Sequence, residues 1–132
     1  MAYATRADLE GRYSATEVAQ RESVLPTGAL DRALADANAE IDSYLRGQYA
    51  VPLSPVPVDI VRLACAIARY RLLGEAESER ARQDYEDAVR FLRDVRAGRA
   101  SVADVVPLAG SGGAATVSLV NGRERAFGGS GA

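Results

Sequence analysis

Three prolines, Pro52, Pro55 and Pro57, stand within six residues in the middle of the chain and forbid a continuous helix through this point. The segment before them has apolar residues at three- and four-residue spacing, which predicts an amphipathic helix. The members of this apolar stripe are Leu30, Ala33, Leu34, Ala37, Ile41, Tyr44 and Leu45. We expect Thr27 to cap the start of this helix and Gly47 to end it in the left-handed region. The chain must therefore turn a corner at the prolines.

The segment after the prolines, DIVRLACAIARYRLL, is apolar on nearly every side. Such a pattern is typical of a helix that other helices cover. A further helical segment begins at Ser78, its expected N-cap, and ends at Gly98. On this segment Glu86 precedes Arg90 by one turn, which is the favourable order for an ion pair.

The first 25 residues predict two short helices, because Thr5 and Ser14 are suitable N-caps and Glu17 completes the spacing of a capping box. Neither short segment has enough apolar residues to be stable alone, so both must pack on the longer helices. The fold class is therefore all-α: a small helical bundle of about three long helices with short N-terminal helices.

The chain changes character after residue 99. Residues 100–132 are rich in Gly, Ala and Ser, and they contain the runs TVSLV and RERAF on either side of an Asn-Gly dipeptide. Asn-Gly between two such runs is a strong signal for a β-hairpin, here at 116–127. We therefore divide the 132 residues into a helical core at 1–99 and a C-terminal tail at 100–132, which is extended or hairpin-forming and which we expect to bind a partner or a neighbouring copy. The alternative, which the composition also favours, is a disordered tail.

Composition argues against several functional classes. The chain has one cysteine, no histidine and a net charge of −2, so it lacks the ligands of common zinc sites and the usual general base. Cys65 lies in an apolar run and is expected to be a buried structural thiol. We expect no catalytic, metal or cofactor site and no enzymatic activity. Acidic residues such as Asp84 and Asp87 are interpreted as solvated helix positions.

The first residues carry charges where a signal peptide needs an apolar core, and no segment has the length of a membrane-spanning helix. The expectation is a protein made inside the cell, with no membrane contact.

Three stretches together resemble the Mu-type phage head–tail joining protein family. They are ADANAEIDSYLRGQYAVPL, RLACAIARYRL and YEDAVRFLRDVRAG, and the opening YATRADLEGRY fits the same pattern. The resemblance covers roughly the first hundred residues. It implies a head–tail connector, or adaptor, that forms a ring beneath the portal of a tailed phage or phage-like particle. Such a ring extends the DNA channel and docks the stopper or tail-completion protein.

The resemblance further implies a set of partners and a location. The partners are the portal protein, neighbouring copies in a ring that is twelve-fold in related particles, and the stopper. DNA would be passing cargo only. The location is the neck of the virion, after synthesis in the bacterial host cytoplasm. The C-terminal segment of such adaptors typically grips the portal or a neighbour.

Two groups of residues are the candidate interfaces. The first belongs to the tail and is directed at the portal or a neighbour: Leu108, Val117, Leu119, Val120, Arg123, Arg125 and Phe127. The second belongs to the proline-rich loop: Tyr49, Val51, Pro52, Leu53 and Pro55. A stiff loop loses little entropy on binding, which suits a contact surface.

A DNA-binding helical packaging subunit is the alternative, because the chain combines several short helices with sixteen arginines. Eighteen acidic residues are interspersed among them, and no basic stripe emerges. Arg62, Arg69 and Arg71 lie on the apolar helix, where pairing with Asp or Glu is the better interpretation.

Overall fold

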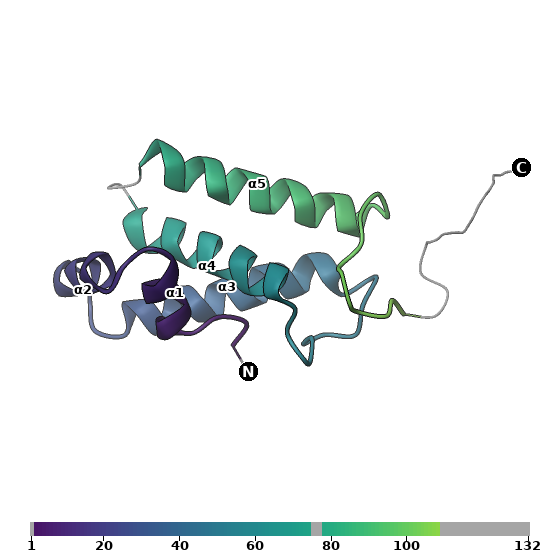
Figure 1. Cartoon of the computed structure of the whole chain (residues 1–132), viewed down its shortest axis with the longest axis horizontal. Helices are drawn as coiled ribbons and strands as arrows, with labels where there is room; N and C mark the ends of the chain where they lie inside the picture. Colours follow the sequence, from purple (N-terminus) through teal and green to yellow (C-terminus); the bar gives the residue numbers. More distant parts are fainter. Residues whose placement is uncertain (1, 75–77, 109–132) are drawn as a thin grey trace, which may run out of the picture.

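The central feature of the fold is a helix that is buried on most of its sides. The computed structural model describes residues 2–74 and 78–108, and this part of the chain contains helices and no strand (Figure 1). The helices are α1 (Arg6–Arg12), α2 (Ala15–Val24), α3 (Ala29–Leu45), α4 (Val58–Leu73) and α5 (Glu79–Arg96). The predicted all-α bundle is confirmed, and the hairpin predicted at 116–127 lies outside the described residues.

Helix α4 packs against α3, α5 and α1, while α3 and α5 also contact each other. Its buried residues, which occupy more than one side of the helix, are Ile60, Leu63, Ala64, Cys65, Ala66, Ile67, Ala68, Leu72 and Leu73. The prediction that the segment after the prolines is central is therefore confirmed. Burial of such side chains from water is the main source of stability in a bundle of this size.

Polar contacts centred on Glu40 of α3 join the three long helices. The carboxylate of Glu40 accepts a hydrogen bond from the Tyr85 hydroxyl at 3.0 Å and pairs with Arg71 at 2.6 Å. Tyr85 of α5 also stacks on Tyr70 of α4, with ring centroids 4.2 Å apart. One carboxylate on α3 thus binds side chains from both α4 and α5.

The two short helices are attached to the bundle by arginines. The Arg69 guanidinium on α4 pairs with Glu17 of α2 at 2.9 Å and lies 4.2 Å from the centroid of the Tyr13 ring. In return, Arg21 of α2 donates hydrogen bonds to the carbonyl oxygens of Leu72, at 3.1 and 3.3 Å, and of Leu73, at 3.3 Å. Arg21 thereby satisfies carbonyl groups that the last turn of a helix leaves without intrahelical partners.

The predicted pairing of the α4 arginines is confirmed for the described residues: Arg69 and Arg71 bind carboxylates on other helices, and Arg62 lies 3.9 Å from Asp59 on its own helix.

The expected caps are partly confirmed. Thr5 and Ser78 accept hydrogen bonds from the backbone amides of Asp8 and Ala81, as N-caps do. The Ser14 hydroxyl likewise accepts from the Glu17 amide at 3.1 Å, but the Glu17 carboxylate binds Arg69.

Two expectations about the ends of α3 are wrong. Gly28, with a φ of +85°, occupies the N-cap position in place of Thr27. The helix ends at Leu45, followed by Arg46 in a right-handed conformation, so Gly47 is not the left-handed residue that stops it. Left-handed glycines stand instead at Gly74 and Gly98, after α4 and α5.

Shortening a buried side chain on the central helix tests this architecture. Leu63→Ala should lower the free energy of unfolding by about 2–5 kcal/mol, because Leu63 is 1% exposed and its truncation leaves a cavity in the core. Val58→Ala is the matched control on the same helix: Val58 is 75% exposed, so the change should stay within about 0.5 kcal/mol. Urea unfolding followed by circular dichroism measures both. Equal losses would contradict a central position for α4.

Candidate functional site

The corner loop, residues 46–57, and the segment that follows α5 come together at one end of the bundle (Figure 1). We call residues 97–108 the strap. The buried amide of Val102 in the strap donates a hydrogen bond to the Tyr49 hydroxyl at 2.8 Å, and the Leu108 amide donates to the Gln48 carbonyl at 2.8 Å. The Gln48 side chain donates to the Arg96 carbonyl at 3.2 Å. The loop and the strap are therefore bound to each other at several points.

A second tyrosine binds the same loop to the N-terminal segment. The Tyr3 hydroxyl accepts a hydrogen bond from the Leu53 amide at 2.9 Å and donates one to Asp42 on α3. The Tyr3 amide donates to Asn38 on α3 at 2.9 Å. Tyr3 is 2% exposed. Sequence reasoning gave it no role, because nothing local indicates that its hydroxyl reaches a loop 50 residues away.

The structure divides the predicted loop residues into two groups. Pro52 and Pro55 are exposed, and Val51 is half-buried. Tyr49 and Leu53 are each only 2% exposed, so neither side chain is on the surface of the single chain. The Tyr49 ring packs in the core of its own chain, and its hydroxyl is occupied by the Val102 amide.

Among the predicted tail residues, Leu108 lies within the described part of the chain and is 41% exposed. The other six, Val117, Leu119, Val120, Arg123, Arg125 and Phe127, lie outside the described residues. The start of the predicted tail is not separate from the core, because Val102 is 3% exposed and belongs to the main hydrophobic cluster. The signal that could have indicated this is the apolar spacing within SVADVVPL, which the sequence analysis grouped with the tail on composition.

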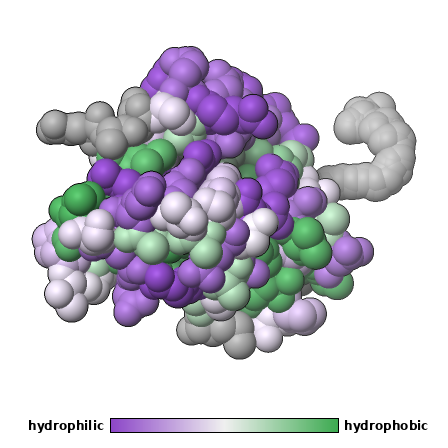
Figure 2. Space-filling view, turned by 60° about the vertical axis from the view of Figure 1, so that its left-hand side comes forward, coloured by the Kyte–Doolittle hydropathy of each residue, from purple (hydrophilic) through white to green (hydrophobic). Residues whose placement is uncertain are grey.

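The loop and the strap enclose a shallow groove of about 300 Å³. Its lining residues are Ala50, Pro52, Leu53, Ser54, Pro55, Asp104, Val105 and Val106. Val106 is 87% exposed at its rim, and sequence reasoning missed it. Val58, directly after the loop, is 75% exposed. Hydrophobic surface is visible in Figure 2, between areas of polar residues. Exposed aliphatic side chains around a groove, rimmed by polar residues, are typical of a protein–protein contact surface.

The same end of the bundle is rich in arginine. Residues 88–99 contain Arg90, Arg93, Arg96 and Arg99 and a single acid, Asp94. Arg99 pairs with Asp94 at 2.9 Å, and the Arg96 guanidinium lies 4.6 Å from the centroid of the Tyr44 ring on α3. Because α3 and α5 both end here, these cations also interact favourably with the negative ends of two helix dipoles.

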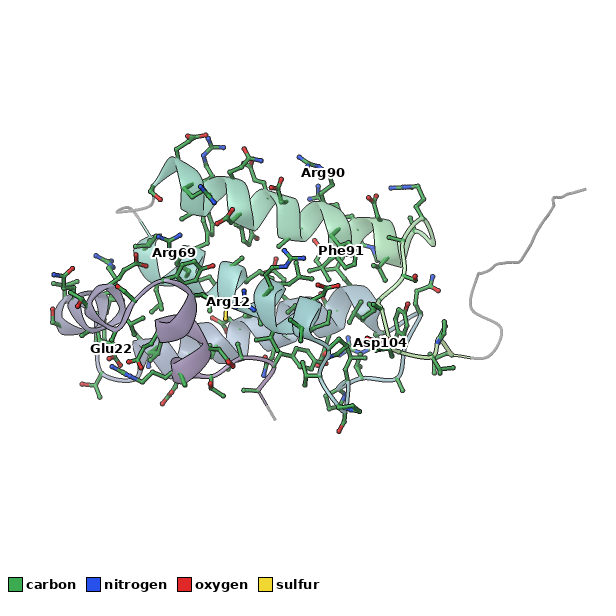
Figure 3. The ribbon with its side chains drawn as sticks, in the orientation of Figure 1. Arg12, Glu22, Arg69, Arg90, Phe91 and Asp104 are labelled. Carbon is green, nitrogen blue, oxygen red and sulfur yellow. The ribbon has the colours of Figure 1, made fainter. Side chains whose placement is uncertain are left out.

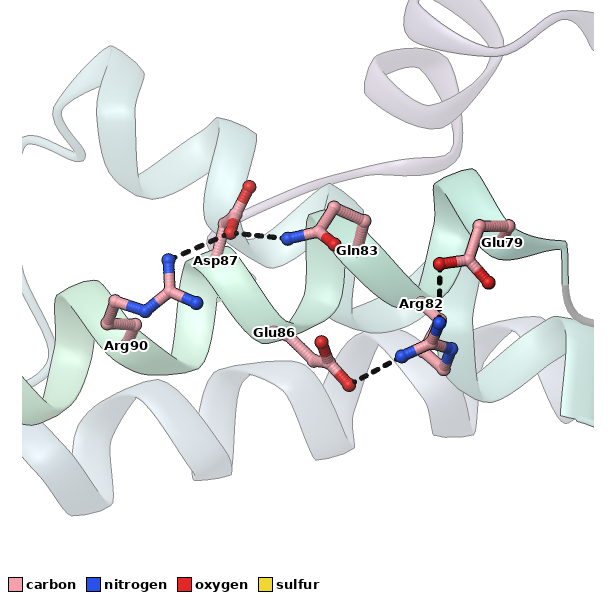
Figure 4. A network of polar contacts seen from close by, with 6 residues as sticks. All are labelled: Glu79, Arg82, Gln83, Glu86, Asp87 and Arg90. Carbon is pink, nitrogen blue, oxygen red and sulfur yellow. Dashed lines mark hydrogen bonds and ion pairs between the residues drawn. The ribbon is translucent and has the colours of Figure 1, made fainter.

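The outer face of α5 is an ion-pair network (Figure 4). Arg82 binds both Glu79 and Glu86, and Asp87 accepts hydrogen bonds from Gln83 at 3.0 Å and from Arg90 at 3.1 Å. The predicted pair between Glu86 and Arg90 is therefore wrong: Glu86 is bound by Arg82, one turn earlier, and Arg90 reaches Asp87. This face is the purple area at the top of Figure 2.

Two features bear on possible reactive groups: the acidic side chains of the described residues and the buried thiol of Cys65. Within residues 2–74 and 78–108 no group of three or more His, Cys, Asp or Glu side chains could hold a metal ion. Cys65 is fully buried, and this burial raises its pKa to about 11, which keeps the thiol protonated and unreactive at neutral pH. None of the helices in the described part of the chain has the length and hydrophobicity needed to cross a bilayer.

Comparison with known proteins gives one consistent result. The family model described as "Bacteriophage Mu, Gp36" matches residues 3–115. The "Mu-like prophage FluMu protein gp36" of Haemophilus influenzae is 42% identical over 105 residues, which cover 76% of this chain and 74% of that protein. "Gene product J" of Escherichia phage Mu is 37% identical over 105 residues, covering 75% and 74% of the two chains. The matched region includes all five helices, the corner loop and the strap.

The raised pKa values of Tyr3, Tyr85 and Cys65 predict how stability responds to alkaline pH. Burial, together with the hydrogen bond to Asp42, raises the pKa of Tyr3 to about 12, and burial with the hydrogen bond to Glu40 raises that of Tyr85 to about 12. The unfolded chain loses these protons near pH 10, and that of Cys65 about one unit lower, whereas the folded chain retains them. Stability is therefore fully present below about pH 8 and falls as the pH rises toward 12.

Urea unfolding at intervals between pH 8 and pH 11.5 measures this slope. The double variant Tyr3→Phe/Tyr85→Phe should lose some stability at pH 8, because it lacks two hydrogen bonds, but its stability should fall less steeply with pH than that of the natural chain. Parallel curves for the two proteins would contradict raised tyrosine pKa values.

Proposed function

The chain belongs to the bacteriophage Mu Gp36 family, and from this premise we propose that it is the head–tail adaptor of a phage or phage-like particle. The family implies a structural or morphogenesis protein of a Mu-type phage. In the proposed role, copies of the chain form a ring beneath the portal, extend the DNA channel and provide the docking platform for the stopper or tail-completion protein.

The loop and strap surface is the observation that carries this proposal. A ring subunit needs a rigid body whose surface contains unlike contact patches, because each copy meets its neighbours through two different faces. Here a helical bundle supports a groove lined in part by exposed Pro52, Pro55 and Val106, with exposed Leu108 further along the strap. Two buried tyrosines bind the loop and the strap to the core. Exposed aliphatic side chains on a supported backbone are suited to a permanent contact with another protein.

The partners follow from the same role. They are the portal protein, neighbouring copies in a ring whose expected symmetry is twelve-fold, and the stopper. DNA passes through the ring as cargo, and the protein itself requires no cofactor and performs no catalysis. The protein is made in the host cytoplasm and is incorporated at the neck of the particle.

DNA binding as the primary function has less support. A DNA-binding surface needs several arginines available to phosphates on one face. In the described residues, Arg69, Arg71 and Arg82 are bound to carboxylates on α2, α3 and α5 respectively. Their charges are thus compensated within the fold, and the acidic residues beside them would repel a phosphate backbone.

The test is co-sedimentation with the portal ring encoded beside this chain. The natural chain should bind in a stoichiometric ratio. Val106→Asp/Leu108→Asp should weaken binding at least tenfold, because it places two carboxylates on the exposed apolar part of the strap. Gln83→Asp is the control, since it adds a carboxylate to the exposed outer face of α5 and should leave binding unchanged.

A chain that ends at Leu108 keeps the whole strap and shows how much residues 109–132 contribute. Loss of binding on this truncation would make the tail the principal contact, whereas retention would assign the contact to the loop and strap. Failure of the natural, folded chain to bind the portal would contradict the adaptor role. Salt-dependent binding of that chain to duplex DNA would then favour the alternative.

A further inference from the structure

Helix α2 lies away from the strap, and little of it is buried. Figure 3 shows Glu22 of α2 and Arg69 of α4 toward one end of the long axis, and Asp104 of the strap toward the other. Val18 is the buried residue among the ten of α2, whereas α3, α4 and α5 each bury five residues or more. Helix α2 therefore gains little stability from the removal of apolar surface from water.

Polar contacts hold α2 in place. The Arg69 guanidinium donates two hydrogen bonds to the Glu17 carboxylate, at 2.9 and 3.1 Å. Arg21 donates to the carbonyl oxygens at the end of α4, and Arg6 of α1 pairs with Glu22 at 2.6 Å. Each such contact contributes modestly to stability, because water forms comparable hydrogen bonds with the same groups when they separate.

The packing beneath α2 is incomplete. A cavity of about 10 Å³ lies where α1 and α2 meet α4. Its lining residues are Leu9, Tyr13, Glu17, Val18, Arg21, Arg69, Leu72 and Leu73. Leu72 and Leu73 are only 5% and 8% exposed, so they are covered in the closed chain. Helix α2 thus covers the end of α4 without filling all of the space beneath it.

The backbone on both sides of α2 is irregular. Ser14 has a φ of +138° and a ψ of 149°, a region that glycine adopts readily and other residues rarely. Residues 25–28 join α2 to α3 and end at Gly28, whose φ is +85°. The docked position of α2 therefore strains the backbone at Ser14, and undocking would relieve this strain.

Helix α1 has a firmer attachment of its own. Leu9 is 1% exposed and belongs to the core. Tyr3, just before α1, is bound to α3 through Asn38 and Asp42 and to the corner loop through Leu53. These contacts do not involve α2, so they would persist if α2 moved.

We propose that α2 is a hinged cover: residues 14–28 undock from the end of α4 while α1, α3, α4 and α5 stay folded. The joints are Ser14 on one side and residues 25–28 on the other. The docked state prevails because the polar contacts together outweigh the strain at Ser14. The inference concerns the chain alone and does not depend on the adaptor role.

Undocking changes the surface that the chain presents. It uncovers the side chains of Leu72 and Leu73, the two carbonyl groups that Arg21 binds, and the guanidinium of Arg69. The closed chain therefore conceals an apolar surface at the end of α4. Any contact made there has its affinity reduced by the fraction of chains that are open.

Native-state hydrogen exchange of the full chain, followed by NMR, tests this cover. The amides of residues 19–24 should be protected at least tenfold over an unstructured peptide, yet at least 100-fold less than the Ile67 amide of α4. Low urea concentrations should leave the exchange of the α2 amides nearly unchanged and accelerate that of Ile67, because undocking exposes little surface and global unfolding exposes much.

Removal of one polar contact should loosen α2 alone. R21M keeps the apolar stem of the side chain and removes the donors to the α4 carbonyl groups. It should lower the protection of the α2 amides at least fivefold and leave Ile67 unchanged. Q20A is the matched control, since Gln20 is exposed on the same helix, and it should change neither by more than twofold.

Two substitutions of Ser14 isolate the strain. S14A and S14G both remove the hydroxyl that caps α2, but only glycine adopts the backbone of this position freely. The α2 amides should be protected at least tenfold more in S14G than in S14A. At Ser78, the N-cap of α5 with a φ of −99°, the same pair should differ about fivefold at most in the α5 amides.

Three results would overturn the proposal. The first is exchange of the α2 amides with the protection and urea dependence of Ile67, which would make α2 part of the global folding unit. The second is an equal loss of protection at α2 and Ile67 in R21M. The third is an equal ratio between the glycine and alanine variants at positions 14 and 78, which would remove the strained joint. None of these results bears on portal co-sedimentation, so the adaptor role is tested separately.

Discussion

The hydrogen bond from the Val102 amide to the Tyr49 hydroxyl determines what the surface of this molecule offers to a partner. The strap cannot leave the core without breaking this bond and exposing Val102, and a hydrogen bond of this kind contributes about 0.5–1.5 kcal/mol to stability. In a similar way, the Leu53 amide donates a hydrogen bond to the Tyr3 hydroxyl, and this bond binds the corner loop to the core. Both tyrosines contribute their rings to the core and their hydroxyls to the irregular backbone.

This arrangement keeps irregular segments in place without secondary structure of their own. The prolines of the corner loop lack amide hydrogens, so this segment cannot form the regular backbone hydrogen bonds of a helix or a sheet. Tyr3 of the N-terminal segment and Tyr49 of the loop itself therefore supply the partners with their side-chain hydroxyls. As a result, the backbone beneath the exposed residues of the loop and strap is held in place before a partner binds. Binding therefore costs less conformational entropy.

Local features of the sequence predicted most of the fold. The helices, the buried position of α4 and the N-caps Thr5 and Ser78 follow from spacing and capping rules that act within a few residues. The candidate site was predicted less well, because it depends on pairs distant in sequence. Tyr49 and Val102 are 53 residues apart, and Tyr3 and Leu53 are 50 apart. Nothing in the neighbourhood of Tyr49 indicates whether its ring points into the core or to solvent, so its burial could not be predicted from the sequence.

The clearest test of this account is native-state hydrogen exchange of the Val102 amide, followed by NMR in the natural chain and in Tyr49→Phe. The account predicts that this amide exchanges slowly in the natural chain, on the scale of the core helices, and much faster in the variant, while the amide of Ile67 in α4 is little affected. Exchange of Val102 at the rate of an unstructured peptide in the natural chain would contradict the claim that the strap is part of the folded body.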